Sequence, residues 1–147
     1  MPVYTVTTPM GTLDETQKEQ LAVGITDIHG EETGAPEPLI HVVFNAYPPG
    51  VAWTSRKPGA PIVVNASIRF GRSEDVRRRM LERINTLVSE TIGVPDRNIL
   101  VALFDFQPHW AMEAGMVLPS VDPDDETRWD AAFYAKYPER ATAGAQA

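Results

Sequence analysis

The chain has 147 residues, a formal net charge of −7 and no cysteine, so a single domain over residues 1–147 without disulfides is expected. The negative charge argues against a protein that binds nucleic acid through its phosphates, and no apolar run reaches the ~20 residues that cross a bilayer. Because the first residues also lack the pattern of a signal peptide, we expect a soluble, cytoplasmic protein.

The first third of the chain predicts a strand, a helix and a second strand. Residues 3–8 are mostly β-branched or aromatic, which favours a strand. Thr12 or Asp14 can cap the helix that follows, and Gly34 ends it. The buried stripe of this helix is predicted to contain Leu21, Ile25 and Ile28. Residues 39–46 are almost continuously apolar and predict the second strand.

The same order of elements returns after a stretch rich in proline and glycine at 48–61, which predicts turns and no domain boundary. Residues 62–69 predict a third strand, Ser73 a helix start, and residues 99–106 a fourth strand. The apolar stripe of the second helix is predicted to contain Val76, Met80, Ile84 and Leu87.

Two segments repeat each other at a constant offset of 59 residues, ITDIHGEETGAP at 25–36 and INTLVSETIGVP at 84–95. We therefore predict two βαβ units, at about 2–60 and 61–120, that form a four-stranded α/β sheet with both helices on one face. Two helices cannot cover both faces, so the second face is expected to pack against other subunits.

Residues 121–147 are predicted to form a C-terminal helix and tail. The helix spans 125–137 and carries Trp129 and Phe133 at a spacing of four. The acidic run DPDDE at 122–126 lacks the pattern of a calcium loop, and we interpret it as a solvent-exposed run that caps this helix.

Pro2 has two interpretations. Its ring suits the first residue of a strand because it fixes φ and needs no amide donor. If Met1 is removed, Pro2 instead carries a secondary amine whose ordinary pKa is about 8, and its surroundings would make this amine a general base or a general acid.

Four further side chains are candidates for chemistry, each with a structural alternative. Arg69 and Arg72 could hold one carboxylate between them, or they could pair with Glu74 and Asp75.

His29 borders the buried helix stripe and could be purely structural, and Glu113 could be an exposed surface residue. The three histidines, His29, His41 and His109, have no zinc-site spacing, and no phosphate-binding loop is present in the sequence.

Several motifs together resemble the tautomerase superfamily and, within it, the cis-3-chloroacrylic acid dehalogenase group. They are PVY at 2–4, ITDIH at 25–29, TG at 33–34, RFGRS at 69–73 and MEAG with LP at 112–119. The resemblance implies a homotrimer of the tautomerase/MIF-like fold that needs no metal or organic cofactor and acts on a small carboxylate.

The resemblance also implies roles for single residues. Pro2 matches the catalytic proline and Glu113 the glutamate that activates water, whereas His29, Arg69 and Arg72 match the residues that bind the substrate carboxylate. One residue of the group does not match, because its tyrosine on the last strand corresponds here to Ala102 or Leu103, depending on a one-residue gap.

The function implied by the resemblance is hydration and hydrolytic dehalogenation of small 3-substituted acrylates, with accompanying keto-enol tautomerase activity. Two alternatives stay open: an enzyme that is primarily a tautomerase of phenylpyruvate-like 2-oxo acids, and a non-enzymatic binding trimer similar to macrophage migration inhibitory factor.

Overall fold

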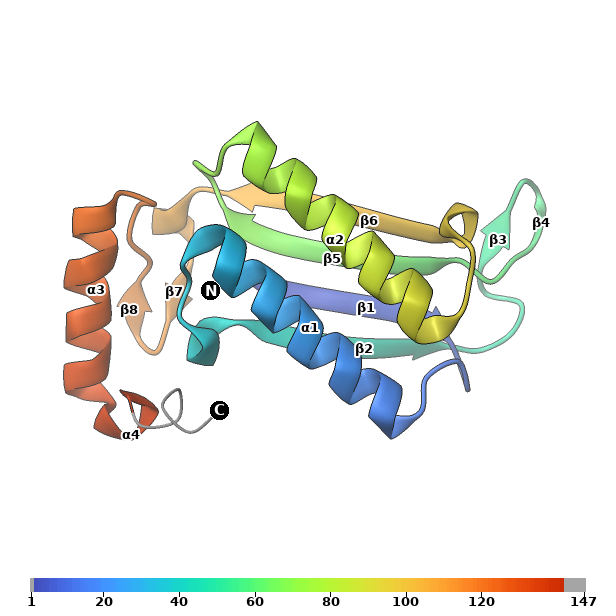
Figure 1. Cartoon of the computed structure of the whole chain (residues 1–147), viewed down its shortest axis with the longest axis horizontal. Coiled ribbons are helices and arrows are strands. Elements are labelled where there is room, and N and C mark those ends of the chain that lie inside the picture. The colour runs from blue at the N-terminus through green and yellow to red at the C-terminus, as the bar shows by residue number, and fades with distance from the viewer. Residues whose placement is uncertain (1, 142–147) are drawn as a thin grey trace.

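The computed structural model describes residues 2–141, and a four-stranded sheet forms its centre (Figure 1). In spatial order its strands are β2 (His41–Tyr47), β1 (Val3–Pro9), β5 (Ile62–Arg69) and β6 (Ile99–Phe106). β1 pairs parallel with β2 and β5 pairs parallel with β6, while β1 and β5 run antiparallel. The predicted α/β fold is confirmed, and the predicted tail at 142–147 lies outside the described residues.

Both long helices lie on one face of the sheet (Figure 1): α1 (Glu15–Thr33) and α2 (Glu74–Ile92). Asp14, and not Thr12, caps α1, because its side chain accepts a bond from the backbone N–H of Gln17 in a capping box. Gly34 ends α1 with a φ of 72°, and Ser73 caps α2.

The main core lies between these helices and the sheet. Alternate residues of β1 and β5 point into it, and the centres of both helix stripes are fully buried. The fully buried core residues include Tyr4, Val6, Leu21, Ile25, Val64, Met80, Ile84 and Val88. In α2 the third buried position is Val88 and not the predicted Leu87. Leu87 is only partly buried and packs beside Gly24 of α1.

No helix among the described residues covers the opposite face of the sheet, which we call the open face (Figure 1). The strand register places Val63, Asn65 and Ser67 of β5 on this face, beside Leu100, Ala102 and Phe104 of β6. Arg69 and Phe106, at the ends of these strands, pack against the C-terminal segment. Leu100 is 56% exposed and Phe104 57% exposed. A surface of this composition is suited to contact with another protein chain.

The segment after β6 forms a small layer at one end of the sheet (Figure 1). It contains a short hairpin and two helices: β7 (Met112–Glu113), β8 (Met116–Val117), α3 (Pro123–Lys136) and α4 (Pro138–Ala141). Trp129 and Phe133 stack at 5.4 Å and form a second, smaller core with Leu39 and Leu118. The predicted C-terminal helix is thus present, and its aromatic face is buried.

The remaining elements are short. A hairpin in the proline-rich loop pairs β3 (Trp53–Thr54) with β4 (Lys57–Pro58), and three 3₁₀ turns span Glu37–Leu39, Asp96–Asn98 and Pro108–Trp110. None of the helices among residues 2–141 combines the length and apolar composition that a membrane span requires.

Candidate active site

The sheet topology brings Pro2, His41 and Arg69 to the same end of the sheet. β1 starts where its parallel neighbour β2 starts and where its antiparallel neighbour β5 ends. Pro2 is fully buried directly before β1, and its carbonyl accepts a 3.1 Å hydrogen bond from the backbone N–H of His41. A catalytic group at Pro2 would therefore lie on a central strand of the fold.

A glycine turn places the two arginines. Arg69 is the last residue of β5, and Gly71 has a φ of 112°, a conformation that L side chains rarely adopt. A Cβ atom at Gly71 would also collide with Cγ2 of Val121, in the loop before α3. Only glycine allows the chain to turn tightly from Arg69 to Arg72 while the C-terminal segment packs against it.

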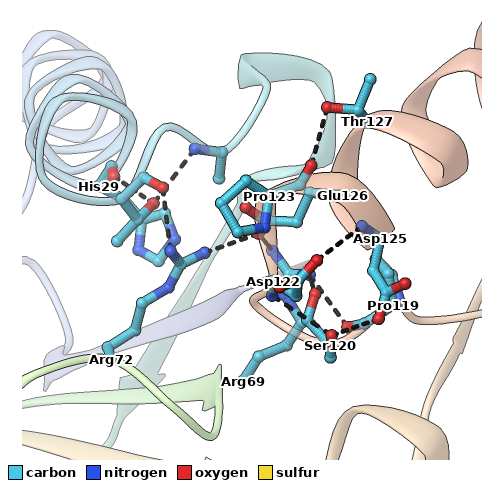
Figure 2. Close-up of polar contacts among 12 residues, drawn as sticks. His29, Arg69, Arg72, Pro119, Ser120, Asp122, Pro123, Asp125, Glu126 and Thr127 are labelled. Carbon is cyan, nitrogen blue, oxygen red and sulfur yellow. Dashed lines mark hydrogen bonds and ion pairs between the residues drawn. The ribbon is translucent and has the colours of Figure 1, made fainter.

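Arg69 and Arg72 converge on one carboxylate, that of Glu126 in α3 (Figure 2). Both Nη2 atoms bond to the same oxygen, Oε1, and the distance from Arg72 is 3.1 Å. Their remaining bonds go to backbone carbonyls, from Arg69 to Pro119 and Ser120 and from Arg72 to Thr33. The partner of the arginine pair is therefore Glu126, and neither Glu74 nor Asp75.

His29 is buried and neutral. Burial and the nearby charge of Arg72 lower the pKa of its imidazole from 6.5 to about 3, and Figure 2 shows the two side chains together. Its Nδ1 lies 2.7 Å from the hydroxyl of Tyr4, whose own pKa is raised by burial. Since no other acceptor for this hydroxyl occurs among the described residues, Tyr4 donates to Nδ1 and the ring proton of His29 resides on Nε2. His29 is thus a hydrogen-bond donor beside two cations.

The buried, neutral His29 makes the fold sensitive to acid. Between pH 6.5 and about 3 the unfolded chain protonates this histidine and the folded chain does not, so stability is lost as the pH falls. Each pH unit in this window removes up to ~1.4 kcal/mol from the free energy of unfolding. Urea denaturation at pH 7.5, 6 and 5 should show a shallower pH dependence for His29→Gln than for wild type. The exposed His109→Gln should keep the wild-type slope, and an unchanged slope in His29→Gln would contradict this assignment.

Two cavities lie on either side of Leu39. The first is about 30 Å³ and is lined by Arg69, Glu126 and Asp130, so it has room for little more than a water molecule. Burial, and then the charge of Glu126, raise the pKa of Asp130. The second cavity is about 270 Å³ and is lined by His41, Glu113, Phe133 and Tyr137, among others. Of these two cavities, the second is large enough for a small organic acid.

Glu113 faces the larger cavity from the short β7–β8 hairpin. Its side chain is 9% exposed, and its Oε1 lies 2.8 Å from Nε2 of His41. The hairpin turns at Ala114 and Gly115, both with positive φ, as two-residue hairpin turns require. Lys136 and Tyr137 at the end of α3 donate to the carbonyl of Ala114 and fix this turn.

The five predicted site residues thus form one group of three and two residues that lie apart from that group. His29, Arg69 and Arg72 lie together around Glu126, Glu113 lies in the larger cavity with His41, and Pro2 is linked to His41 through the backbone. Of the two positions that could correspond to the group's tyrosine, Ala102 pairs with Asn65 and faces the open side, whereas Leu103 faces the core.

Sequence reasoning missed Glu126 and the pairing of His41 with Glu113. Glu126 belongs to the DPDDE run, in which Asp122 does cap α3 as expected. Glu126 precedes Trp129 by three residues and Phe133 by seven, so helical periodicity places it on the buried face with them. That spacing could have identified it. No local pattern pairs His41 with Glu113, which is 72 residues away.

Comparisons with known proteins agree with this architecture. A family model, Tautomerase_3, described as "Putative oxalocrotonate tautomerase enzyme", matches residues 1–132. No curated protein matches the chain. The crystal structure of native Ps01740 is 37% identical, with a TM-score of 0.75 over 76% of this chain and 99% of that one.

Two more distant structures share the fold. N1, a member of the cis-3-chloroacrylic acid dehalogenase family, is 24% identical, with a TM-score of 0.80 over 84% of this chain and 88% of that one. A fused 4-OT solved as a symmetric trimer is 19% identical, with a TM-score of 0.73 over 79% and 94%. Because the family model covers nearly the whole described chain, the protein belongs to the Tautomerase_3 family of the tautomerase superfamily.

Proposed function

We propose that this chain is an amino-terminal-proline enzyme that transfers a proton on a small unsaturated or 2-oxo carboxylate, and that adds water to 3-substituted acrylates. The observation that carries the proposal is the convergence of Arg69 and Arg72 on one carboxylate oxygen, with the N–H donor His29 beside them. Glu126 supplies that carboxylate within the chain, so the pair already has the geometry that a carboxylate ligand needs.

Each group has a distinct task in this proposal. Once Met1 is removed, the secondary amine of Pro2 exchanges a proton with a substrate carbon. Arg69, Arg72 and His29 hold the substrate carboxylate and stabilise negative charge that develops on the neighbouring atoms. A substrate carboxylate reaches the arginines by taking the place of Glu126, which requires α3 to shift.

Water addition requires one further group, which we assign to Glu113. The carboxylate of Glu113 takes a proton from a water molecule while the oxygen of that water bonds to C3 of the acrylate. Pro2 delivers a proton to C2. When C3 carries a halogen, the resulting halohydrin loses hydrogen halide and leaves an aldehyde. The side chain of Glu113 is 9% exposed and lines a cavity of about 270 Å³, which has room for a small acrylate and water.

A narrower function, tautomerisation of 2-oxo acids with little dehalogenation, is favoured by one observation. The group's tyrosine corresponds to Ala102 or Leu103, and neither of these side chains has a hydroxyl. Tautomerisation needs only the proline and the carboxylate-binding residues.

Two assays on one preparation test these functions. Mass spectrometry first establishes that the sample begins at Pro2, and a matched sample that retains Met1 serves as the blocked control. We expect enol-to-keto conversion of an arylpyruvate only in the sample that begins at Pro2. Halide release from cis-3-chloroacrylate by the sample that begins at Pro2 supports the wider function, and conversion of the arylpyruvate without halide release supports the narrower one. If neither substrate reacts faster in this sample than in the sample that retains Met1, a binding protein is favoured.

We also propose that the open face packs against two further copies of the chain. Phe104 and Leu100 are more than half exposed there, and the fused 4-OT neighbour is a symmetric trimer. Sedimentation velocity should show a trimer for wild type and a smaller species for Phe104→Glu. Val23→Glu, at a 54% exposed position on α1, should remain trimeric, and a monomeric wild type would contradict the proposal.

A further inference from the structure

His41 has no role so far, although its partner Glu113 has been assigned the activation of water. His41 is the first residue of β2 and is 44% exposed at its side chain, whereas Glu113 comes from the β7–β8 hairpin and is 9% exposed. Their side chains meet at 2.8 Å between Nε2 and Oε1. Two segments that are far apart in the sequence therefore hold one carboxylate at a defined place.

Both partners are fixed by their own backbones. The N–H of His41 donates to the carbonyl of Pro2, so the start of β2 is bound directly to the proposed catalytic residue. On the other side, Lys136 and Tyr137 donate to the carbonyl of Ala114, the residue that follows Glu113. The pair thus has little freedom to move relative to Pro2.

The side chains of the pair face the larger cavity. His41 and Glu113 line it together, and Phe133 and Tyr137 supply apolar surface beside them. A carboxylate that takes a proton from one water must hold a single orientation, but the terminal torsion of glutamate is broad and weakly restrained. A hydrogen bond from a neighbouring side chain supplies the missing restraint.

We propose that His41 is a positioning residue for Glu113. This inference rests on the proposed water addition. His41 donates its Nε2–H to Oε1 and holds the carboxylate toward the cavity, where the water and C3 of the acrylate meet. His41 touches no reacting atom itself, so it acts on the hydration step and leaves the transfer of the proton by Pro2 unchanged.

Parallel measurement of two reactions tests this role. In His41→Ala, kcat for water addition to a 3-substituted acrylate should fall by about ten- to a hundredfold, the worth of a hydrogen bond to a charged group. The tautomerisation rate of an arylpyruvate in the same sample should stay within about twofold. His41→Gln, which retains an N–H donor, should recover most of the hydration rate. Asn45→Ala, on the same strand and face, serves as the matched control.

The outcomes separate the two proposals. An equal loss of both activities in His41→Ala, or no loss of either, overturns the positioning role while the proposed function stands. Failure of His41→Gln to recover hydration also counts against a hydrogen bond as the cause. If wild type adds water no faster than Pro2→Ala, the proposed hydration fails and the role of His41 fails with it.

Discussion

Replacing Pro2 by alanine should lower kcat/KM for enol-to-keto conversion of an arylpyruvate by ~10²–10⁴-fold, the range for losing a general acid or base. Alanine keeps a terminal amine but has no ring that fixes the nitrogen about its N–Cα bond, so the nitrogen loses its fixed direction and becomes a primary amine. Pro2 is fully buried at the start of a central strand, which holds the ring in one position. Stopped-flow absorbance of the enol measures the rate.

The control for Pro2→Ala is Pro49→Ala, in an exposed turn that follows β2 at the opposite end of the sheet from Pro2. It should turn over substrate at the wild-type rate. The sample that retains Met1 separates the amine from the ring, because its proline nitrogen is a nonbasic amide. Loss of activity in Pro2→Ala but not in the sample that retains Met1 would show that the ring matters only for folding. Wild-type rates in both would rule out catalysis by Pro2.

The central fold is predictable from local patterns. Alternation along residues 62–69 and the stripes with Leu21, Ile25, Met80 and Ile84 each identify one element, and the 59-residue repeat joins them into two units. The short hairpins are not predictable in this way. Strands of two residues are too short to show alternation of buried and exposed residues. The turn at Ala114 has a positive φ, and alanine in a sequence does not indicate that conformation.

The site is predictable only as far as its residues lie in recognisable motifs. Arg69 and Arg72 share one glycine turn, so their proximity follows from the sequence. The carboxylate of Glu126 reaches them from a segment more than 50 residues away. Charge alone made Glu126 look solvent-exposed, whereas packing of Trp129 and Phe133 turns its face of α3 inward. Tertiary contact decides its role.

Replacing Glu126 by glutamine should tighten the binding of small carboxylates while it destabilises the fold. Wild type has two guanidinium groups on one carboxylate, with side chains only 9% and 14% exposed for Arg69 and Arg72. A neutral amide leaves the two positive charges adjacent, and burial already lowers the pKa of Arg72. The free energy of unfolding should fall by roughly 1–3 kcal/mol, below the cost for a fully buried pair because Glu126 is 25% exposed.

The same loss favours an external anion. In wild type a ligand carboxylate must displace Glu126, and in Glu126→Gln it meets two arginines that have lost the carboxylate they share. If removing the charge of Glu126 makes binding of the ligand carboxylate more favourable by ~1–3 kcal/mol, propanoate should bind Glu126→Gln roughly 5- to 150-fold more tightly than wild type. Calorimetric titration with propanoate, which has no double bond to react, measures this change without turnover.

The affinity for propanoate and the free energy of unfolding should change in opposite directions in Glu126→Gln if the ligand displaces Glu126. Asp124→Asn, an exposed acid in the first turn of the same helix, should change neither quantity. If Glu126 instead held the arginines in position for the ligand, Glu126→Gln would weaken propanoate binding as well as the fold. Tighter binding together with lower stability, recovered when propanoate is added during urea denaturation, is the result that displacement requires, because a ligand stabilises the state that binds it.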